Sequence, residues 1–296
     1  MPEILTLSIG DISFAIEWQG LHGKWDIPPA YRPFIGSGKT DIRLVLHKDP
    51  PEIRSGKQIF DSPPIWSLFR YQGKYAIKIF ETLEGLQRTL ILPPRLDEAE
   101  LFFNASGSRF MSPFFGPTLE LLMINCLARQ KGVILHTCGI TQNNSGTLFA
   151  GESGAGKSTM AGLWNLKNGI EVLSDDRTVV RKKDGKFRMY GTPWHGEAKF
   201  GSPQSAGLDK LFFIRHGDAN SVRKIRGAEA VQYLLTCSFP PYWDSAGMKF
   251  TLEFFSQMAA AVPCYELFFK PDMNVIELIK KVSSEITKQA GRTPRT

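Results

Sequence analysis

The feature that most constrains this chain is a glycine-rich segment at residues 151–158, which reads Gly-Glu-Ser-Gly-Ala-Gly-Lys-Ser. It satisfies every fixed position of the pattern Gly-x-x-x-x-Gly-Lys-[Ser/Thr]. Such a segment forms a phosphate-binding loop only when a strand precedes it and a helix follows it. The apolar run at 147–150 predicts the strand, and the spacing over 159–166 predicts the helix. The middle of the chain is therefore expected to have α/β structure.

Each residue type in the loop has a physical reason. The glycines permit the positive φ angles that turn successive backbone N–H groups into one concavity, and the helix N-terminus faces the bound phosphates. Lysine supplies a charge to the β- and γ-phosphates, and the following hydroxyl binds Mg²⁺. We therefore expect ATP and Mg²⁺ as cofactors, bound by Gly151, Glu152, Ser153, Gly154, Ala155, Gly156, Lys157, Ser158 and Thr159.

A chance glycine-rich turn with a surface lysine is the alternative, and the strand and helix on either side argue against it. Residues 36–40 (Gly-Ser-Gly-Lys-Thr) provide an internal comparison. There Pro33 occupies the place of the required first glycine, so an ordinary loop is expected.

Carboxylates and a histidine flank the loop. Asp175 and Asp176 close a short apolar strand at 171–174, where a metal ligand or a general base is needed, although a solvated turn would use the same residues. His136 lies in an apolar strand at 133–140, and a histidine in such a strand is more often a core residue. His195 lies in the glycine-containing, polar-aromatic segment 190–197, which is typical of either a functional loop or a structural turn.

The rest of the chain predicts two domains and a tail. Short β segments bounded by Gly, Pro or charged residues predict a mostly antiparallel β domain over 1–112, and 113–288 is the α/β domain that carries the loop. The α/β domain begins with a helix at 117–131 and contains a hairpin at Asp184-Gly185 and helices around 228–235, 252–261 and 275–287. Residues 289–296 are expected to fray.

Composition and charge distribution limit the classes of partner that are expected. Lys and Arg exceed Asp and Glu by 36 − 29 = 7, but they are scattered, so no nucleic-acid partner is expected. No apolar run approaches the roughly 18 residues of a membrane span, and the N-terminus lacks the features of a signal peptide. The four cysteines form no Cys-x-x-Cys pair and are expected to be buried free thiols. Together these features predict a soluble, cytoplasmic protein.

The order of these motifs resembles the HPr kinase/phosphorylase family, which has a histidine strand, a Gly-[Asp/Glu]-Ser-Gly-x-Gly-Lys-Ser loop and an Asp-Asp motif. His136 to Lys157 is 21 positions and Lys157 to Asp175 is 18, and the resemblance covers residues 133–194. It implies a phosphoenolpyruvate carboxykinase-like P-loop fold and possible homo-oligomers.

The same resemblance implies roles for individual residues. Lys157 would contact phosphate, Ser158 would hold Mg²⁺, and Asp175 would be the proton acceptor or donor for the hydroxyl. Asp176 would support metal or water, and His136 would be the active-site histidine. The family's metal-binding glutamate lies in a Leu-Glu-[Ile/Val]-Arg-Gly signature that is absent here, and Glu197 is its expected substitute. Because that signature is associated with HPr handling, a different acceptor is expected.

The leading hypothesis is an ATP- and Mg²⁺-dependent kinase that transfers the γ-phosphate to a hydroxyl, on a serine of a peptide or protein or on free serine. A nucleotide-binding sensor or assembly module with slow hydrolysis and no phosphoacceptor is the alternative. An ATPase acting on nucleic acid is supported only by net charge.

Overall fold

The structure is a computed structural model that describes residues 4–18, 26–49, 51, 53, 56–80, 87–104 and 114–290. Contacts between Cα atoms divide the chain into two units. The first comprises Met1–Lys131 and Pro240–Phe250, and the second Gly132–Phe239 and Thr251–Thr296. The predicted domain boundary at 112/113 and most of the predicted tail, 291–296, lie outside the described residues.

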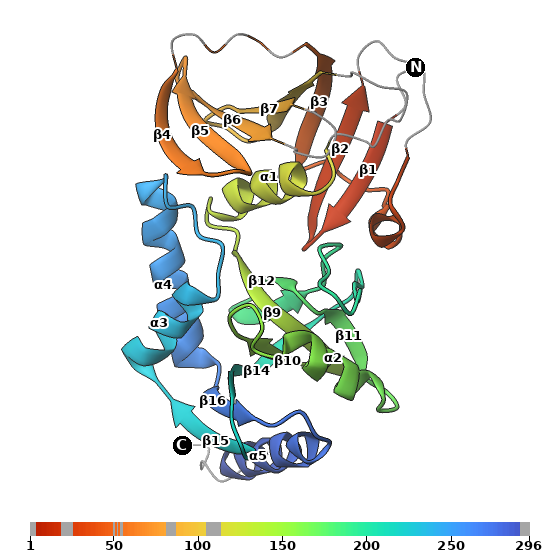
Figure 1. The fold of residues 1–296 in the computed structure, drawn as a ribbon, viewed down its shortest axis with the longest axis vertical. Coiled ribbons are helices and arrows are strands. Elements are labelled where there is room, and N and C mark those ends of the chain that lie inside the picture. The colour runs from red at the N-terminus through yellow and green to blue at the C-terminus, as the bar shows by residue number, and fades with distance from the viewer. Residues whose placement is uncertain are drawn as a thin grey trace. The chain divides into compact units, whose positions relative to one another are not determined.

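The first unit is built on one eight-stranded sheet with the order β1-β2-β3-β8-β7-β6-β5-β4 (Figure 1). Its strands are β1 (Ile4–Ile9), β2 (Ile12–Trp18), β3 (Ile42–Lys48), β4 (Lys57–Ser62), β5 (Trp66–Tyr71), β6 (Lys74–Phe80), β7 (Gln87–Leu92) and β8 (Glu98–Phe103). A short helix, η1 (Pro29–Phe34), follows β2, and α1 (Pro117–Leu127) follows the sheet. Most neighbours are antiparallel, as predicted, but β3 pairs in parallel with both β2 and β8.

Local sequence accounts for these elements. Gly10 and Asp11 both have positive φ angles, as a two-residue hairpin between β1 and β2 requires. Buried residues alternate along β1, which is typical of a strand with one covered face. Arg88 of β7 donates hydrogen bonds to Phe115 O and Thr118 Oγ1, both at 3.2 Å, and so fixes the start of α1.

The second unit is a mixed sheet with helices, and it confirms the expected α/β class. Its strands are β9 (Val133–Gln142), β10 (Ser145–Ala150), β11 (Glu171–Ser174), β12 (Arg177–Lys183), β13 (Lys186–Tyr190), β14 (Ser205–His216), β15 (Ser221–Ile225) and β16 (Cys264–Phe269). The helices are α2 (Lys157–Asn165), α3 (Gly227–Thr236), α4 (Ser245–Ala261), whose first turns belong to the first unit, and α5 (Asn274–Ala290). The predicted hairpin at Asp184-Gly185 joins β12 to β13.

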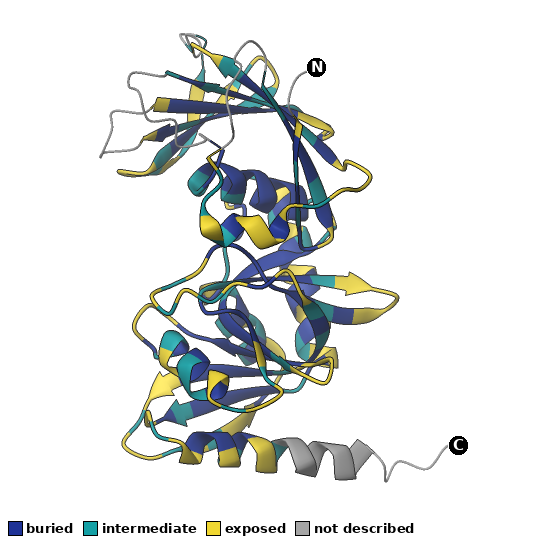
Figure 2. Ribbon diagram, turned by 90° about the vertical axis from the view of Figure 1, so that its right-hand side faces the viewer, coloured by how far each residue is buried: buried dark blue, intermediate teal, exposed yellow. Residues whose placement is uncertain are grey.

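Two features of this sheet position the loop. β10 lies between antiparallel β9 and parallel β14, and β14 is parallel to β16, so the carboxyl ends of β10, β14 and β16 lie at one edge. A core cluster joins α2 and α5 to these strands through residues such as Phe149, Trp164 and Ile276. Figure 2 shows a buried face and an exposed face on the part of α5 before residue 283. The strand before the loop and the helix after it are therefore both held by packed side chains.

Across the described residues, no helix has the length and apolar character that crossing a bilayer requires. The four cysteines are free and buried, as expected from their spacing.

Candidate active site

Residues 151–156 connect β10 directly to α2 and have the backbone of a phosphate loop. Gly154 and Gly156 have φ angles of +81° and +102°, which favour glycine. A Cβ on Gly151 would lie 2.8 Å from the Cβ of Ala155, and one on Gly156 would lie 2.8 Å from the Phe269 ring. The glycines of the pattern are therefore required here by backbone angle and by space.

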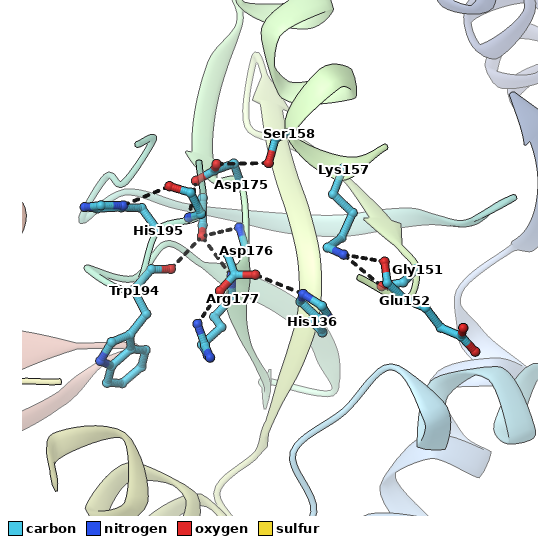
Figure 3. Close-up of polar contacts among 12 residues, drawn as sticks. His136, Gly151, Glu152, Lys157, Ser158, Asp175, Asp176, Arg177, Trp194 and His195 are labelled. Carbon is cyan, nitrogen blue, oxygen red and sulfur yellow. Dashed lines mark hydrogen bonds and ion pairs between the residues drawn. The ribbon is translucent and has the colours of Figure 1, made fainter. Parts of the chain in front are cut away.

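Lys157 is the first residue of α2, and its side chain folds back over the loop (Figure 3). Its Nζ donates hydrogen bonds of 2.9 Å to Gly151 O and Glu152 O. Burial lowers the pKa of this ammonium group, and the charges of Asp176 and Asp175 offset part of that effect. Lys157 is thus a buried cation held where the N-terminus of α2 meets the loop.

The two aspartates lie between two strands that both pair with β9. β11 pairs opposite residues 139–141, and β12 pairs with residues 133–136, with Arg177 opposite His136. Ser174 stabilises this connection because its hydroxyl accepts hydrogen bonds from the backbone N–H groups of Asp176 and Arg177. It also donates to Trp194 O at 3.4 Å. The Asp175-Asp176 pair is therefore a fixed interruption in the sheet and not a solvated turn.

Asp175 is buried, with 1% of its surface exposed. It accepts hydrogen bonds from three backbone N–H groups of the segment 196–200: Gly196 at 2.9 Å, Ala198 at 2.9 Å and Phe200 at 3.3 Å. The hydroxyl of Ser158 lies 3.4 Å from its Oδ2. Asp175 thus joins the helix start, through Ser158, to the loop that carries Glu197.

Asp176 is half-buried and has side-chain partners instead. Its Oδ1 lies 2.9 Å from Nε2 of His136, and its Oδ2 accepts from Arg177 Nη1. Burial acts to raise the pKa of Asp176. The hydrogen bond with His136 and the positive charges of Arg177 and Lys157 outweigh burial, so the pKa lies below its ordinary value. The guanidinium of Arg177 also lies over the Phe239 ring, 5.0 Å from its centroid.

These groups surround one cavity of about 250 Å³. Most of the sequence-predicted site residues line it, and the complete lining is His136, Ser153, Gly154, Gly156, Lys157, Ser158, Thr159, Asp175, Asp176, Gly196 and Glu197. Gly151, Glu152 and Ala155 line a second cavity, which also includes Ser153 and Gly154. His195 is exposed, and its ring nitrogen Nδ1 lies within hydrogen-bond distance of Gly196 O, at 3.1 Å.

Several parts of this site leave no motif in the sequence. Ser174 and the backbone amides of 196–200 are not recognisable from a motif, because their role depends on where the chain returns in space. Arg177 directly follows the Asp-Asp pair, and that adjacency was the available signal. Within the described ranges, no group of three or more His, Cys, Asp or Glu side chains is placed to hold a metal by itself.

Comparisons with known proteins give a structural similarity but no match of sequence. No protein-family model matches this sequence, and no curated protein sequence matches it. Among solved structures, the chain is similar to the Hpr(Ser) kinase/phosphatase from Coxiella burnetii. The sequences are 11% identical, the match covers 53% of this chain and 98% of the other, and the TM-score is 0.31. At that score the likeness carries no functional weight, so the case for function rests on the site itself.

Proposed function

We propose that this chain binds ATP with Mg²⁺ at residues 151–158 and transfers the γ-phosphoryl group to a hydroxyl acceptor. One observation carries the proposal. Lys157 and Ser158, at the N-terminus of α2, line the same cavity as the carboxylates of Asp175 and Asp176. A phosphate cradle and a carboxylate pair in one cavity are the parts that phosphoryl transfer needs.

The residues present fit the two cofactors. The positive-φ glycines, the start of α2 and the buried ammonium group of Lys157 suit phosphate oxygens. The oxygen atoms of Ser158, Asp176 and Glu197 line the cavity and suit Mg²⁺, which usually takes one or two carboxylates with water and phosphate oxygens. When bound, Mg²⁺ would neutralise charge on the phosphates.

The contacts of the two aspartates support different roles. The oxygens of Asp175 already accept three backbone hydrogen bonds, so Asp175 suits the positioning of Ser158 and of the Glu197 loop. Both oxygens of Asp176 also have partners, but these are the side chains of His136 and Arg177 and not backbone amides, and we propose that Asp176 accepts the hydroxyl proton. This proposal differs from the motif resemblance, which implies that role for Asp175.

In the proposed step, the acceptor oxygen forms a bond to the γ-phosphorus as the bond from that phosphorus to the β–γ bridging oxygen breaks. The hydroxyl proton passes to Asp176 late in the step, and ADP leaves with the bridging oxygen. The acceptor class, a serine hydroxyl of a peptide or protein or free serine, is carried over from the motif resemblance.

The test is retention of label from γ-labelled ATP, with Mg²⁺, in a screen of serine, short peptides and HPr. We expect labelled acceptor with the wild-type protein and none with Lys157→Ala. Asp176→Asn should bind ATP but transfer about 10²–10⁴-fold more slowly. Asp184→Asn, at the exposed β12–β13 turn, is the matched control and should keep full activity.

Release of the label only as free phosphate, whatever the acceptor, would favour the sensor alternative over a kinase. Undiminished transfer by Asp176→Asn would remove the role proposed for that carboxylate.

A further inference from the structure

A second cavity, of about 500 Å³, borders the loop. It is lined by loop residues 151–155, by the carboxyl end of β14 and by one face of α3. Ser153 and Gly154 line both this cavity and the one that contains the aspartates. In Figure 3 the side chain of Glu152 points away from Asp176 and His136. The volume of this second cavity lies in the range of about 300–1,000 Å³ that is usual for small-molecule sites.

The wall of this cavity is held rigidly by a buried carboxylate on β16. Glu266, 5% exposed, accepts hydrogen bonds from Arg215 Nε at 2.7 Å, from the Tyr233 hydroxyl at 2.9 Å and from Arg223 Nη2 at 2.7 Å. Burial acts to raise the pKa of Glu266, but these hydrogen bonds outweigh it, and the pKa lies below its ordinary value. Glu266 is therefore an anion that fixes Arg215 on β14 and Tyr233 on α3.

Arg215 offers a flat cationic surface in this wall. Its guanidinium lies over the Tyr233 ring, 5.1 Å from the centroid, and the Tyr233 ring in turn packs against Phe213 at 5.0 Å. The Arg215 side chain is nevertheless 51% exposed. A guanidinium supported on one face by an aromatic ring presents its other face to a planar ligand, and such faces stack well on nucleobases.

The cavity is also tied to the phosphate loop. His216, the last residue of β14, has Nε2 2.8 Å from Gly154 O. The exposed amide of Gln232 on α3 can donate to and accept from a base edge, and the carboxylate of Glu152 can accept hydrogen bonds from ribose hydroxyls. The cavity therefore offers a guanidinium stacked on an aromatic ring, an amide and a carboxylate beside the phosphate loop. These groups together suit a nucleoside.

The orientation that phosphoryl transfer requires of ATP places its nucleoside end at this second cavity. The transferred phosphoryl group must lie beside the carboxylates, because an acceptor hydroxyl there can lose its proton to Asp176. The nucleoside end of ATP must then extend away from them, and this cavity adjoins the loop on that side. We propose that the cavity lined by Glu152, Arg215, Gln232 and Tyr233 binds the base and ribose of the nucleotide, with the base stacked on Arg215. This inference rests on the proposed function.

Inorganic tripolyphosphate tests it, since it has the phosphates of ATP and no nucleoside. Dissociation constants for Mg²⁺-ATP and Mg²⁺-tripolyphosphate are measured by calorimetry, and the ratio of the two isolates the nucleoside contribution. Arg215→Lys keeps a cation beside Glu266 but loses the planar face, and should weaken ATP binding about tenfold. Gln232→Ala, at an exposed position, should weaken it about threefold. Both variants should bind tripolyphosphate within twofold of wild type, whereas Lys157→Ala should lose both ligands.

The outcomes separate the two proposals. If wild-type protein binds both ligands and neither variant changes the ratio, the nucleoside binds elsewhere and only this inference fails. A higher KM for the acceptor with unchanged ATP affinity would overturn it too, by assigning the cavity to the acceptor. If wild-type protein binds neither ligand, the proposed function fails and this inference falls with it.

Discussion

Replacing Asp175 with asparagine tests the claim that this carboxylate holds the loop at 196–200. The side chain is 1% exposed, and it accepts from the amides of Gly196, Ala198 and Phe200. Asparagine has nearly the same shape but one acceptor atom. If its oxygen takes the place of Oδ1, Gly196 and Phe200 keep a neutral acceptor, while the Ala198 amide meets an NH₂ group.

The stability lost in Asp175→Asn can be worked out from these contacts. Exchanging an ionic acceptor for a neutral one weakens each retained hydrogen bond by about 1 kcal/mol, and a buried donor without an acceptor costs about 1–3 kcal/mol. The sum is roughly 3–5 kcal/mol, and relief from burying a charge offsets part of it. We expect a net loss of roughly 3 kcal/mol, which lowers the Tm by roughly 6–12 °C for a unit of this size.

Thermal melts give the Tm, and amide hydrogen exchange locates the change. Protection should be lost first at Gly196, Ala198 and Phe200. Asp184→Asn, at the exposed turn between β12 and β13, is the matched control and should melt as wild type does. An Asp175→Asn protein with wild-type Tm and protected amides in 196–200 would show that the loop is held by other contacts.

Three further predictions concern the same unit. Gly156→Ala places a Cβ 2.8 Å from the Phe269 ring at a φ of +102°, and should lower the free energy of unfolding by about 1–3 kcal/mol. The Cβ of Gly154→Ala meets no atom within 4 Å, so this substitution should lower it by only about 1 kcal/mol, through backbone strain. Urea denaturation compares the two, and equal losses would contradict the packing argument. Because the pKa of Asp176 is lowered on folding, its charge stabilises the protein above its unfolded-state pKa and that stability is lost as pH falls through the folded-state pKa. Asp176→Asn should therefore flatten the acid limb of a Tm–pH profile below about pH 4, and an unchanged limb would contradict this. Burial raises the pKa of Cys138 and raises that of Cys264 to about 12, so neither thiol should react with a disulfide reagent at neutral pH before unfolding, as mass spectrometry of the labelled protein can check.

The sequence predicted the loop and its two flanking elements because each is specified locally. Glycines with positive φ, a lysine at the helix start and an apolar strand leave their pattern within residues 147–166. The Asp184-Gly185 hairpin was predictable for the same reason. In the first unit, short β segments were predictable because turn residues and charges mark the ends of strands such as β5 and β7.

Three strands of the second unit, β14, β15 and β16, are hard to recognise from sequence, for two physical reasons. β14 and β16 are largely apolar and covered by helices, and a continuous apolar run does not show the alternation that marks an exposed strand. β15 is short and mostly exposed at the edge of the sheet. Missing β14 and β16 also hid the second cavity, because Arg215 and Glu266 gain their roles only when the two strands pair in parallel.

The two aspartates show why a motif names a site more readily than it names roles. The chain bends at Asp175-Asp176 between β11 and β12, and the two neighbouring side chains meet different surroundings. Register decides which meets which: β12 pairs with β9 so that Arg177 lies opposite His136, and this brings Asp176 within 2.9 Å of the imidazole. Asp175 then faces the returning amides of 196–200. The role proposed for Asp176 therefore depends on the pairing of β12 with β9, which places its carboxylate beside His136.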